Sequence, residues 1–364
     1  MVNGEKQMSE VIKQAAESLF QQELQILRER DKGPKPLGWQ LSGQAVRDFV
    51  LGNPQLGISQ KFYGDDALVE RAIVTLMGHQ ALLLVGEPGT AKSLLSELLS
   101  AAISGDSQKF VQGTAGTTEE HIKYSWNYAL LLSHGPTDDA LIPSAIYRAM
   151  HSGTLARFEE VTRCPQEIQD ALISLLSEKQ IMLPELTRVT AAKPGFNLIA
   201  TANLHDRGVN EMSSALKRRF NFETVYPIRD VELEKRLIRQ QVAEKLSRQS
   251  LEQAMDNDVL EVLVTAFNEL RGEKQAAVKA LDAVLSTAEA VNIAYACCLQ
   301  SHYMGSRPCS SQVAEQMQGS ILKDKQDDRK KLAHYLDVVV RDRAKKDGRW
   351  KGFFEAGRKL WLGG

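Results

Sequence analysis

The sequence has few cysteines, almost no net charge and no long apolar run, and each absence excludes a class of protein. Four cysteines in 364 residues form no disulfide-rich pattern, which indicates a reducing compartment. A formal net charge of −1 excludes a protein that binds nucleic acid over its whole surface. The first residues carry no apolar signal core, and no run approaches the length of a membrane span. Together these features predict a soluble, cytoplasmic protein with no membrane partner.

Cysteines at 297, 298 and 309 lie near His302 and could be imagined as a metal cluster. Adjacent cysteines on one apolar helix are far more often core residues. We therefore expect core cysteines here and no zinc.

The most informative segment that is present runs from residue 82 to residue 93, Leu-Leu-Leu-Val-Gly-Glu-Pro-Gly-Thr-Ala-Lys-Ser. An apolar strand enters a glycine-bearing loop, and the loop ends in Lys-Ser where a helix is expected to begin. Glycine lets the backbone curl so that its N–H groups converge on phosphate oxygens, and the positive end of the helix faces the same anion. The segment predicts binding of a nucleoside triphosphate, with ATP and Mg²⁺ as cofactors, although it reads phosphates and does not distinguish ATP from GTP.

Within this loop, Lys92 is expected to neutralise the β- and γ-phosphates, and the Ser93 hydroxyl to ligate Mg²⁺. Ala91 departs from the pattern G-x-x-x-x-G-K-[ST], in which Gly is usual. Because Ala is tolerated in the first turn of a helix, we expect the loop to keep its shape. The full set of expected nucleotide-binding residues in the loop is Gly86, Glu87, Pro88, Gly89, Thr90, Ala91, Lys92, Ser93 and Leu94.

Hydrolysis also requires carboxylates, one for the metal shell and one to activate water. The β-like run Thr154–Phe158 is followed by Glu159 and Glu160. We predict that Glu159 belongs to the Mg²⁺ shell and that Glu160 is the general base. Asp is usual at the first position, and the polar Arg157 interrupts a strand that should be buried, so a solvated acidic turn is the alternative.

A polar residue at the tip of a central strand can orient the attacking water by hydrogen bonding. The run Asn197–Ala202 ends in Asn203, between the phosphate loop and the acidic pair in the expected sheet. We predict that Asn203 has this catalytic role.

The pattern of the chain changes near residue 228. Before that point short β-like runs alternate with helices, which is typical of a parallel sheet wrapped by helices; beyond it only helical patterns remain. The predicted fold class is α/β, a P-loop core followed by an all-α domain. The predicted parts are an N-terminal helical extension (1–60), a nucleotide-binding core (61–228), a helical lid (229–322) and a basic, aromatic tail (323–364).

The expected strands are Leu82–Val85, Phe110–Gln112, Thr154–Phe158, Asn197–Ala202 and Phe222–Tyr226. The expected helices are 9–29, 44–51 with Ser42 as its cap, 66–78, 93–103, 166–179, 230–247, 258–271, 278–300, 310–322 and 327–346.

These motifs together resemble the MoxR branch of the AAA+ ATPases, over roughly residues 60–320. The resemblance rests on the phosphate loop, Glu159-Glu160, Ala-Thr-Ala-Asn203 and Ala215-Leu-Lys-Arg-Arg219-Phe220. The segment Ile122–Pro143 resembles that branch's insert in the second helix, and Ile181–Val189 resembles its hairpin. Minichromosome-maintenance helicases share both insertions, so kinship at the level of the fold does not settle function.

The resemblance implies a homo-oligomeric ring, most simply a hexamer, in which Arg219 reaches the nucleotide of the neighbouring subunit, with Arg218 as a substitute. It implies that Arg307, in Met304-Gly-Ser-Arg307-Pro, contacts the γ-phosphate, although relatives commonly have Pro before Arg. It further implies an ATPase that acts as a chaperone-like remodeller or activator, partnered with a protein that carries a von Willebrand factor A domain.

Two alternatives stay open. The shared insertions and the tail, with thirteen basic and seven acidic residues after position 322 and Trp350, Phe353, Phe354 and Trp361 interleaved, suggest a nucleic-acid translocase. Against it, the hairpin tip at Pro184-Glu185 has only Arg188 and Lys193 as nearby positive residues, whereas a helicase pore needs positive charge to track phosphates. A nucleotide-binding scaffold with little hydrolysis is the second alternative, because of Glu159 and Arg157.

Overall fold

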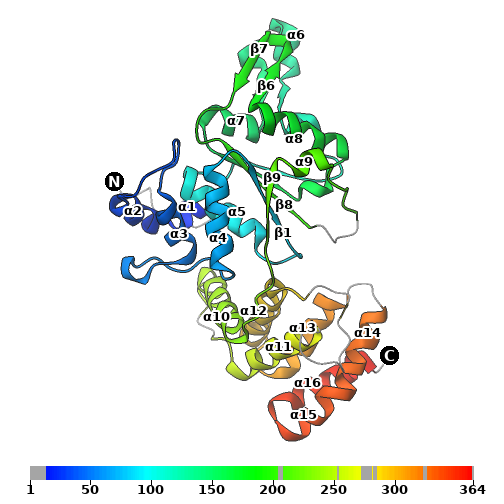
Figure 1. The fold of residues 1–364 in the computed structure, drawn as a ribbon. Coiled ribbons are helices and arrows are strands. Elements are labelled where there is room, and N and C mark those ends of the chain that lie inside the picture. The colour runs from blue at the N-terminus through cyan, green and yellow to red at the C-terminus, as the bar shows by residue number, and fades with distance from the viewer. Residues whose placement is uncertain are drawn as a thin grey trace. The chain divides into compact units, whose positions relative to one another are not determined.

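The computed structural model describes residues 14–203, 208–251, 254–271, 281, 285–322 and 326–362 (Figure 1). The chain divides into two compact units. An α/β unit comprises residues 1–86 and 91–225, and a helical unit comprises residues 87–90 and 226–364. The four-part division predicted from the sequence is finer than these two units and stays a prediction.

A parallel five-stranded sheet forms the centre of the α/β unit, in the order β2-β5-β8-β1-β9. Its strands are β1 (Ala81–Val85), β2 (Phe110–Gln112), β5 (Leu155–Glu159), β8 (Asn197–Ala202) and β9 (Phe220–Thr224). Every residue of β1, β5 and β8 is buried, as expected of strands covered on both faces. The five predicted strands are confirmed, with β9 beginning and ending two residues before its predicted limits.

Helices cover both faces of this sheet, so alternate residues of one strand enter different cores. Leu82 and Leu84 pack with α3 (Gly43–Leu51), α4 (Asp66–Met77) and α5 (Lys92–Ser104). Leu83 and Val85 pack with α7 (Ala145–Ser152), α8 (Gln166–Glu178) and α9 (Ser214–Lys217). The predicted α/β core is therefore confirmed.

The segment before α3 packs into the first of these cores. The predicted helix at residues 9–29 begins outside the described residues, and its described part is broken at Phe20 into α1 (Ala16–Leu19) and α2 (Gln21–Arg30). The Phe20 ring meets the Phe49 ring edge-on at 5.9 Å, and Lys61 donates to Glu23 at 2.6 Å. Ser42 caps α3 by accepting from the Ala45 N–H, as its sequence predicts.

Two excursions project from the same end of the α/β unit (Figure 1). The first contains β3 (Tyr124–Trp126), α6 (Tyr128–His134) and β4 (Leu141–Pro143), and β3 and β4 pair antiparallel. The second is the predicted hairpin, confirmed as β6 (Gln180–Leu183) and β7 (Arg188–Ala191). Short 3₁₀ turns complete the unit: η2 (Pro54–Leu56), η3 (Glu119–His121), η4 (Asp138–Ala140), η5 (Val161–Arg163) and η6 (Pro184–Leu186).

The helical unit contains α10 (Val231–Arg248), α11 (Asn257–Leu270), α12 (Thr287–Tyr303), α13 (Ser310–Ile321), α14 (Gln326–Tyr335), α15 (Arg341–Lys346) and α16 (Arg349–Gly357). Five-residue π-helical segments follow α14 and α16: η7 (Leu336–Val340) and η8 (Arg358–Leu362). The predicted helix at 278–300 begins too early, because Ser286 and Glu289 form a capping box that starts α12 at Thr287. Residues 278–280 and 282–284 of that prediction lie outside the described residues.

The aromatic residues of the basic tail belong to the core of the helical unit. The rings of Trp350, Phe353 and Trp361 are buried and meet edge-on, with centroids 5.6 and 5.7 Å apart. Buried rings cannot stack on exposed bases, which removes the main support for a nucleic-acid site in the tail. Among the described residues, no helix combines the length and apolarity that crossing a membrane would demand.

Candidate functional site

The loop between β1 and α5 has the backbone of a phosphate-binding loop. Gly86 and Gly89 have φ angles of 154° and 77°, which glycine adopts without strain. Lys92 is 5% exposed at the first position of α5, and its Nζ donates to the Gly86 carbonyl at 2.9 Å. The lysine is therefore held against the start of the loop, at the positive end of a thirteen-residue helix.

Ala91 corrects one sequence-based expectation. It lies before α5 as the N-cap, with a left-handed φ of 66°, and not in the first helical turn. Left-handed backbone costs an L-residue about 1–2 kcal/mol, which explains why Gly is usual there. The loop keeps its shape, but with strain at Ala91.

Glu159, the last residue of β5, forms the centre of a buried network. Its Oε2 accepts from the hydroxyls of Ser93 at 2.7 Å and Thr201 at 2.8 Å. Its Oε1 accepts from Ser96 and from the Arg157 guanidinium, both at 2.7 Å. Burial acts to raise the pKa of Glu159, but the charge of Arg157 and the three hydroxyls outweigh it and hold the pKa below its usual value.

Arg157 is buried within β5, so it neither faces solvent nor interrupts the strand. It is 6% exposed and stands two positions before Glu159, so the two side chains leave the same face of β5. The alternative of a solvated acidic turn is wrong for Glu159, which is 5% exposed.

Glu160 follows in a left-handed conformation, with φ 55°. Its N–H donates to the Thr201 hydroxyl at 2.9 Å, and its carboxylate lies 3.6 Å from Arg163. Gly113, just after β2, donates its N–H to the Glu159 carbonyl at 2.7 Å, and a Cβ at Gly113 would stand 2.4 Å from the Glu160 carbonyl oxygen. The turn that presents Glu160 therefore depends on a glycine that directly follows the neighbouring strand.

Asn203 directly follows β8 and is 4% exposed. Because β8 lies between β5 and β1, Asn203, the acidic pair and the phosphate loop follow the carboxyl ends of three adjacent strands. Ligands of open parallel sheets bind at this edge. The sheet thus brings together the residues that the sequence predicts for one site.

The candidate arginines are placed less tightly. Arg219 is half-buried after α9 and donates to Ser177 Oγ at 3.0 Å and to the Ala215 carbonyl at 3.2 Å, whereas Arg218 is exposed. Arg307 is exposed in the helical unit.

Sequence reasoning missed Ser96, Thr201 and Gly113. Ser96 lies one helical turn after Ser93 and Thr201 two residues before Asn203, so spacing could have indicated both. Nothing in the sequence pairs Gly113 with the backbone after β5.

The donor set fits Mg²⁺, which prefers hard oxygen ligands and commonly takes one carboxylate together with phosphate oxygens. The Ser93 hydroxyl and the Glu159 carboxylate supply such oxygens 2.7 Å apart. Among the described residues no histidine, cysteine and carboxylate cluster could hold another metal, and Cys297 and Cys298 are core residues as expected.

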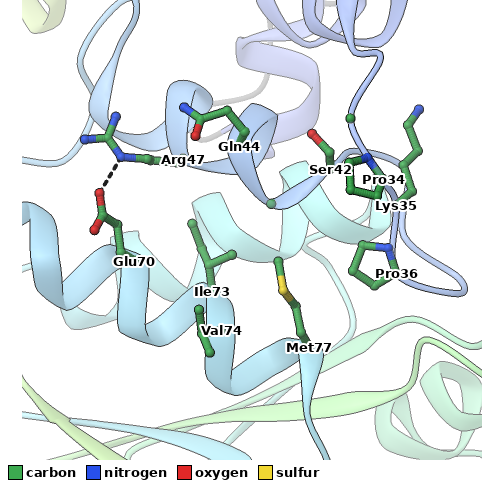
Figure 2. A pocket seen from close by; sticks show the side chains of 12 residues that line it. Pro34, Lys35, Pro36, Ser42, Gln44, Arg47, Glu70, Ile73, Val74 and Met77 are labelled. Carbon is green, nitrogen blue, oxygen red and sulfur yellow. Dashed lines mark hydrogen bonds and ion pairs between the residues drawn. The ribbon is translucent and has the colours of Figure 1, made fainter.

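A pocket of about 780 Å³ lies elsewhere on the α/β unit, between α3, α4 and the loop at residues 33–36 (Figure 2). Ile73, Val74 and Met77 form its apolar side, and Arg47 pairs with Glu70 at 2.7 Å. Its described lining includes none of the motif residues, so we do not assign the nucleotide to it.

A parallel sheet in this strand order, with a phosphate loop after β1 and an acidic pair after β5, defines a AAA+ nucleotide-binding core. Residues 81–220 match the AAA domain of the dynein-related subfamily, and residues 232–360 match the C-terminal domain of YehL-like AAA+ ATPases. The YehL protein of Escherichia coli is 46% identical over 348 residues, which cover 94% of this chain and 96% of that protein. The chain belongs to the YehL-like family of AAA+ ATPases, which are of the MoxR type.

The chain also has two more distant similarities. The chaperone MoxR1 of Mycobacterium tuberculosis is 27% identical over 192 residues, covering 50% of this chain and 45% of that protein. The crystal structure of NtrX from Brucella abortus superposes with a TM-score of 0.51 at 13% identity, covering 81% of this chain and 64% of that chain. The chain thus spans less than two thirds of either protein, and the second similarity shows the fold alone.

Proposed function

We propose that this protein hydrolyses ATP and, as a ring of identical subunits in the cytoplasm, remodels or activates a partner protein. The observation that carries the proposal is the 2.7 Å hydrogen bond from Ser93 to Glu159, which joins the phosphate loop to the acidic pair. Family membership and the similarity to a protein named as a chaperone support the remodelling role.

In this proposal the residues of the loop from Gly86 to Leu94 surround the phosphates, and Lys92 exchanges the Gly86 carbonyl for phosphate oxygens. Ser93 and Glu159 would hold Mg²⁺, which neutralises phosphate charge when it is bound. The Glu160 carboxylate takes a proton from the attacking water, and Asn203 orients that water.

Two arginines complete the proposed site. Arg219 stabilises charge on the γ-phosphate of the neighbouring subunit, which couples hydrolysis to assembly, most simply as a hexamer. Its present bonds to Ser177 and Ala215 would have to open, and the exposed Arg218 is the substitute. The second arginine, Arg307, contacts the γ-phosphate.

The partner-binding surface is proposed at the two excursions of the α/β unit. Large apolar side chains are exposed on both of them: Tyr128, Leu132, Ile142, Met182 and Val189. Leu132, on α6, is 89% exposed. Exposed apolar side chains of this kind suit contact with another protein, and a protein with a von Willebrand factor A domain is the proposed partner.

The test compares Lys92→Ala and Glu160→Gln with the wild type in binding of fluorescent ADP and in phosphate release from ATP. We expect Lys92→Ala to lose at least tenfold in affinity, and Glu160→Gln to bind ATP without turning it over. Lys345→Ala and Glu167→Gln, at exposed positions away from the motifs, are the matched controls.

Other outcomes would decide against parts of the proposal. Affinity of Lys92→Ala within threefold of the wild type would refute the phosphate loop, and unchanged turnover in Glu160→Gln would remove Glu160 from the mechanism. Nucleotide binding by the wild type without turnover would support a scaffold. Stimulation of turnover by single-stranded DNA would support a translocase.

A further inference from the structure

The negative charge of Glu159 is balanced by the guanidinium of Arg157, and several contacts hold that guanidinium in place. Besides its 2.7 Å bond to Glu159, Arg157 donates from Nε to the Ser96 hydroxyl at 3.0 Å and from Nη1 to the Ser107 carbonyl at 2.8 Å. The guanidinium also lies over the Phe110 ring, 5.4 Å from its centroid. Four hydrogen-bond partners, the carbonyl of Ser93 at 3.5 Å among them, and the ring fix the position of the Arg157 guanidinium.

The anchoring extends to the N-terminal helices. Ser107, whose carbonyl accepts from Arg157, donates its N–H to the Glu17 carboxylate of α1 at 3.2 Å. The residue that holds Arg157 is thus itself held by a carboxylate from the segment that precedes the sheet.

The four donors around Glu159 also occupy its acceptor positions. A carboxylate has about four lone-pair sites, and here Arg157, Ser96, Ser93 and Thr201 each fill one. A divalent cation that approached this carboxylate alone would have to displace Ser93 or Thr201. It would also meet a fixed positive charge on the far oxygen, where burial weakens screening.

We infer that Arg157 is a positioning residue, a resident counter-cation that holds Glu159 in place and weakens its affinity for free Mg²⁺, so that the metal enters together with the nucleotide phosphates. This inference rests on the proposed function, because it assigns Glu159 to the metal shell. The triphosphate would supply the additional negative charge that outweighs Arg157, and the Ser93 hydroxyl and Glu159 would hold the metal beside it.

The test measures divalent-metal binding to the nucleotide-free, full-length protein, with Mn²⁺ as the probe and free Mn²⁺ read by electron paramagnetic resonance. We expect Arg157→Met to bind Mn²⁺ at least tenfold more tightly than the wild type, because the repelling charge is gone. Arg157→Lys keeps the charge and should stay within threefold of the wild type. Arg163→Met removes a cation that lies beside Glu160 and not Glu159, so it should also stay within threefold.

Arg157→Met leaves a buried carboxylate unpaired and is expected to lower the melting temperature. Thermal unfolding with and without 10 mM Mg²⁺ therefore accompanies the titration. Under the proposal, Mg²⁺ raises the melting temperature of Arg157→Met by several degrees more than that of the wild type. Equal shifts, or equal Mn²⁺ affinities, would mean that Arg157 only supports the fold, and the inference would be wrong.

The experiments can refute the proposed role of Arg157 and the proposed ATPase activity independently of each other. If the wild type turns over ATP but Arg157→Met binds Mn²⁺ no better, the inference fails and the ATPase stands. If Arg157→Met gains Mn²⁺ affinity while the wild type never turns over ATP, the counter-cation stands and the ATPase fails.

Discussion

At the scale of single residues, Glu159 keeps its charge inside the protein because Arg157 and three hydroxyls stabilise it. Its pKa is lowered in the folded state, so its ionised form contributes stability above its usual pKa of 4.5. That contribution is lost as the pH falls through the lower folded value. The folded carboxylate therefore stays ionised at every pH at which the protein would work.

We predict that Glu159→Gln lowers the free energy of unfolding by about 3–5 kcal/mol at pH 7, because it leaves Arg157 buried and unpaired. The difference from the wild type should be constant above pH 5 and shrink as the pH falls below 4.5, because there the Glu159 carboxylate of the unfolded chain takes up a proton that the folded carboxylate does not. Urea unfolding at pH 7, 5 and 3.5 measures this. Glu70→Gln, which removes an exposed carboxylate paired with the half-buried Arg47, should change stability by less than about 1 kcal/mol at each pH. A difference that does not depend on pH would contradict the assignment.

Ala91→Gly is expected to stabilise the protein by about 0.5–1 kcal/mol. Relief of left-handed strain gains about 1–2 kcal/mol, and the freedom of glycine in the unfolded chain takes back about 0.4–1 kcal/mol. Thermal unfolding measures the change. The control Ala171→Gly, inside α8, should lose about 1 kcal/mol instead. Equal losses in the two variants would show that Ala91 is unstrained.

For single residues, the sequence predicts the chemical roles better than it predicts which residues contact one another. The residue types and their places after strands are enough to predict Lys92, Ser93, Glu159, Glu160 and Asn203 as one site. The pairing of Arg157 with Glu159 could also have been predicted, because residues two apart on a strand share a face. The dependence of Glu160 on Gly113 could not, since it arises only when β2 lies beside β5.

At the scale of elements, the two excursions of the α/β unit are braced to each other. Arg188, at the start of β7, pairs with Asp138 of η4 at 2.6 Å, and Tyr124 of β3 donates to Glu185 of η6 at 2.9 Å. Burial and the bond to Glu185 raise the pKa of Tyr124 to about 12, so the phenol keeps its proton at neutral pH. These two contacts join two separate stretches of the sequence into one surface.

We predict that Arg188→Asp or Asp138→Arg alone loosens this surface, because each places like charges side by side. Amide hydrogen exchange should become faster at residues 122–143 and 180–191, while β1 and β8 stay unchanged. Combining the two substitutions restores the pair with reversed charges and should restore slow exchange. Stability should change by less than about 1 kcal/mol throughout, because the pair is exposed. Fast exchange in the double variant would show that the brace is unimportant.

The start of a helix can be predicted where the sequence contains a capping residue, but a break inside a helix cannot. Ser42 fixes the start of α3, and the Ser286–Glu289 capping box, which the sequence contains, fixes the start of α12. The break at Phe20 could not be predicted, because the helical spacing of apolar residues continues through it.

At the scale of the whole molecule, the proposed ring requires that subunits share sites. Arg219→Ala and Glu160→Gln should each abolish turnover while leaving nucleotide binding intact. Mixed in equal amounts, they should regain activity, since about a quarter of the interfaces then combine an intact Glu160 with an intact Arg219. Arg218→Ala mixed in the same way shows which arginine acts in trans. Turnover that stays absent in every mixture would contradict a shared site.

The fold class of the whole chain can be predicted from the sequence. The change from alternating strands and helices to helices alone lies close to the boundary between the two units. The role of the tail was not accessible. Its aromatic spacing suggests an exposed binding face, yet Trp350, Phe353 and Trp361 complete the core of the helical unit. Composition cannot tell a stacking platform from a hydrophobic core.

The position of β1 in the sheet has a consequence for how the chain is made. β1 lies between β8 and β9, and these two strands, which pair with its backbone, leave the ribosome long after it. At about 5–20 residues per second, the 139 residues from Val85 at the end of β1 to Thr224 at the end of β9 take roughly 7–28 s to synthesise. Until then the two strands that pair with this apolar strand are incomplete. The sheet beside the phosphate loop is complete only when β9, the final strand of the sheet, has been synthesised.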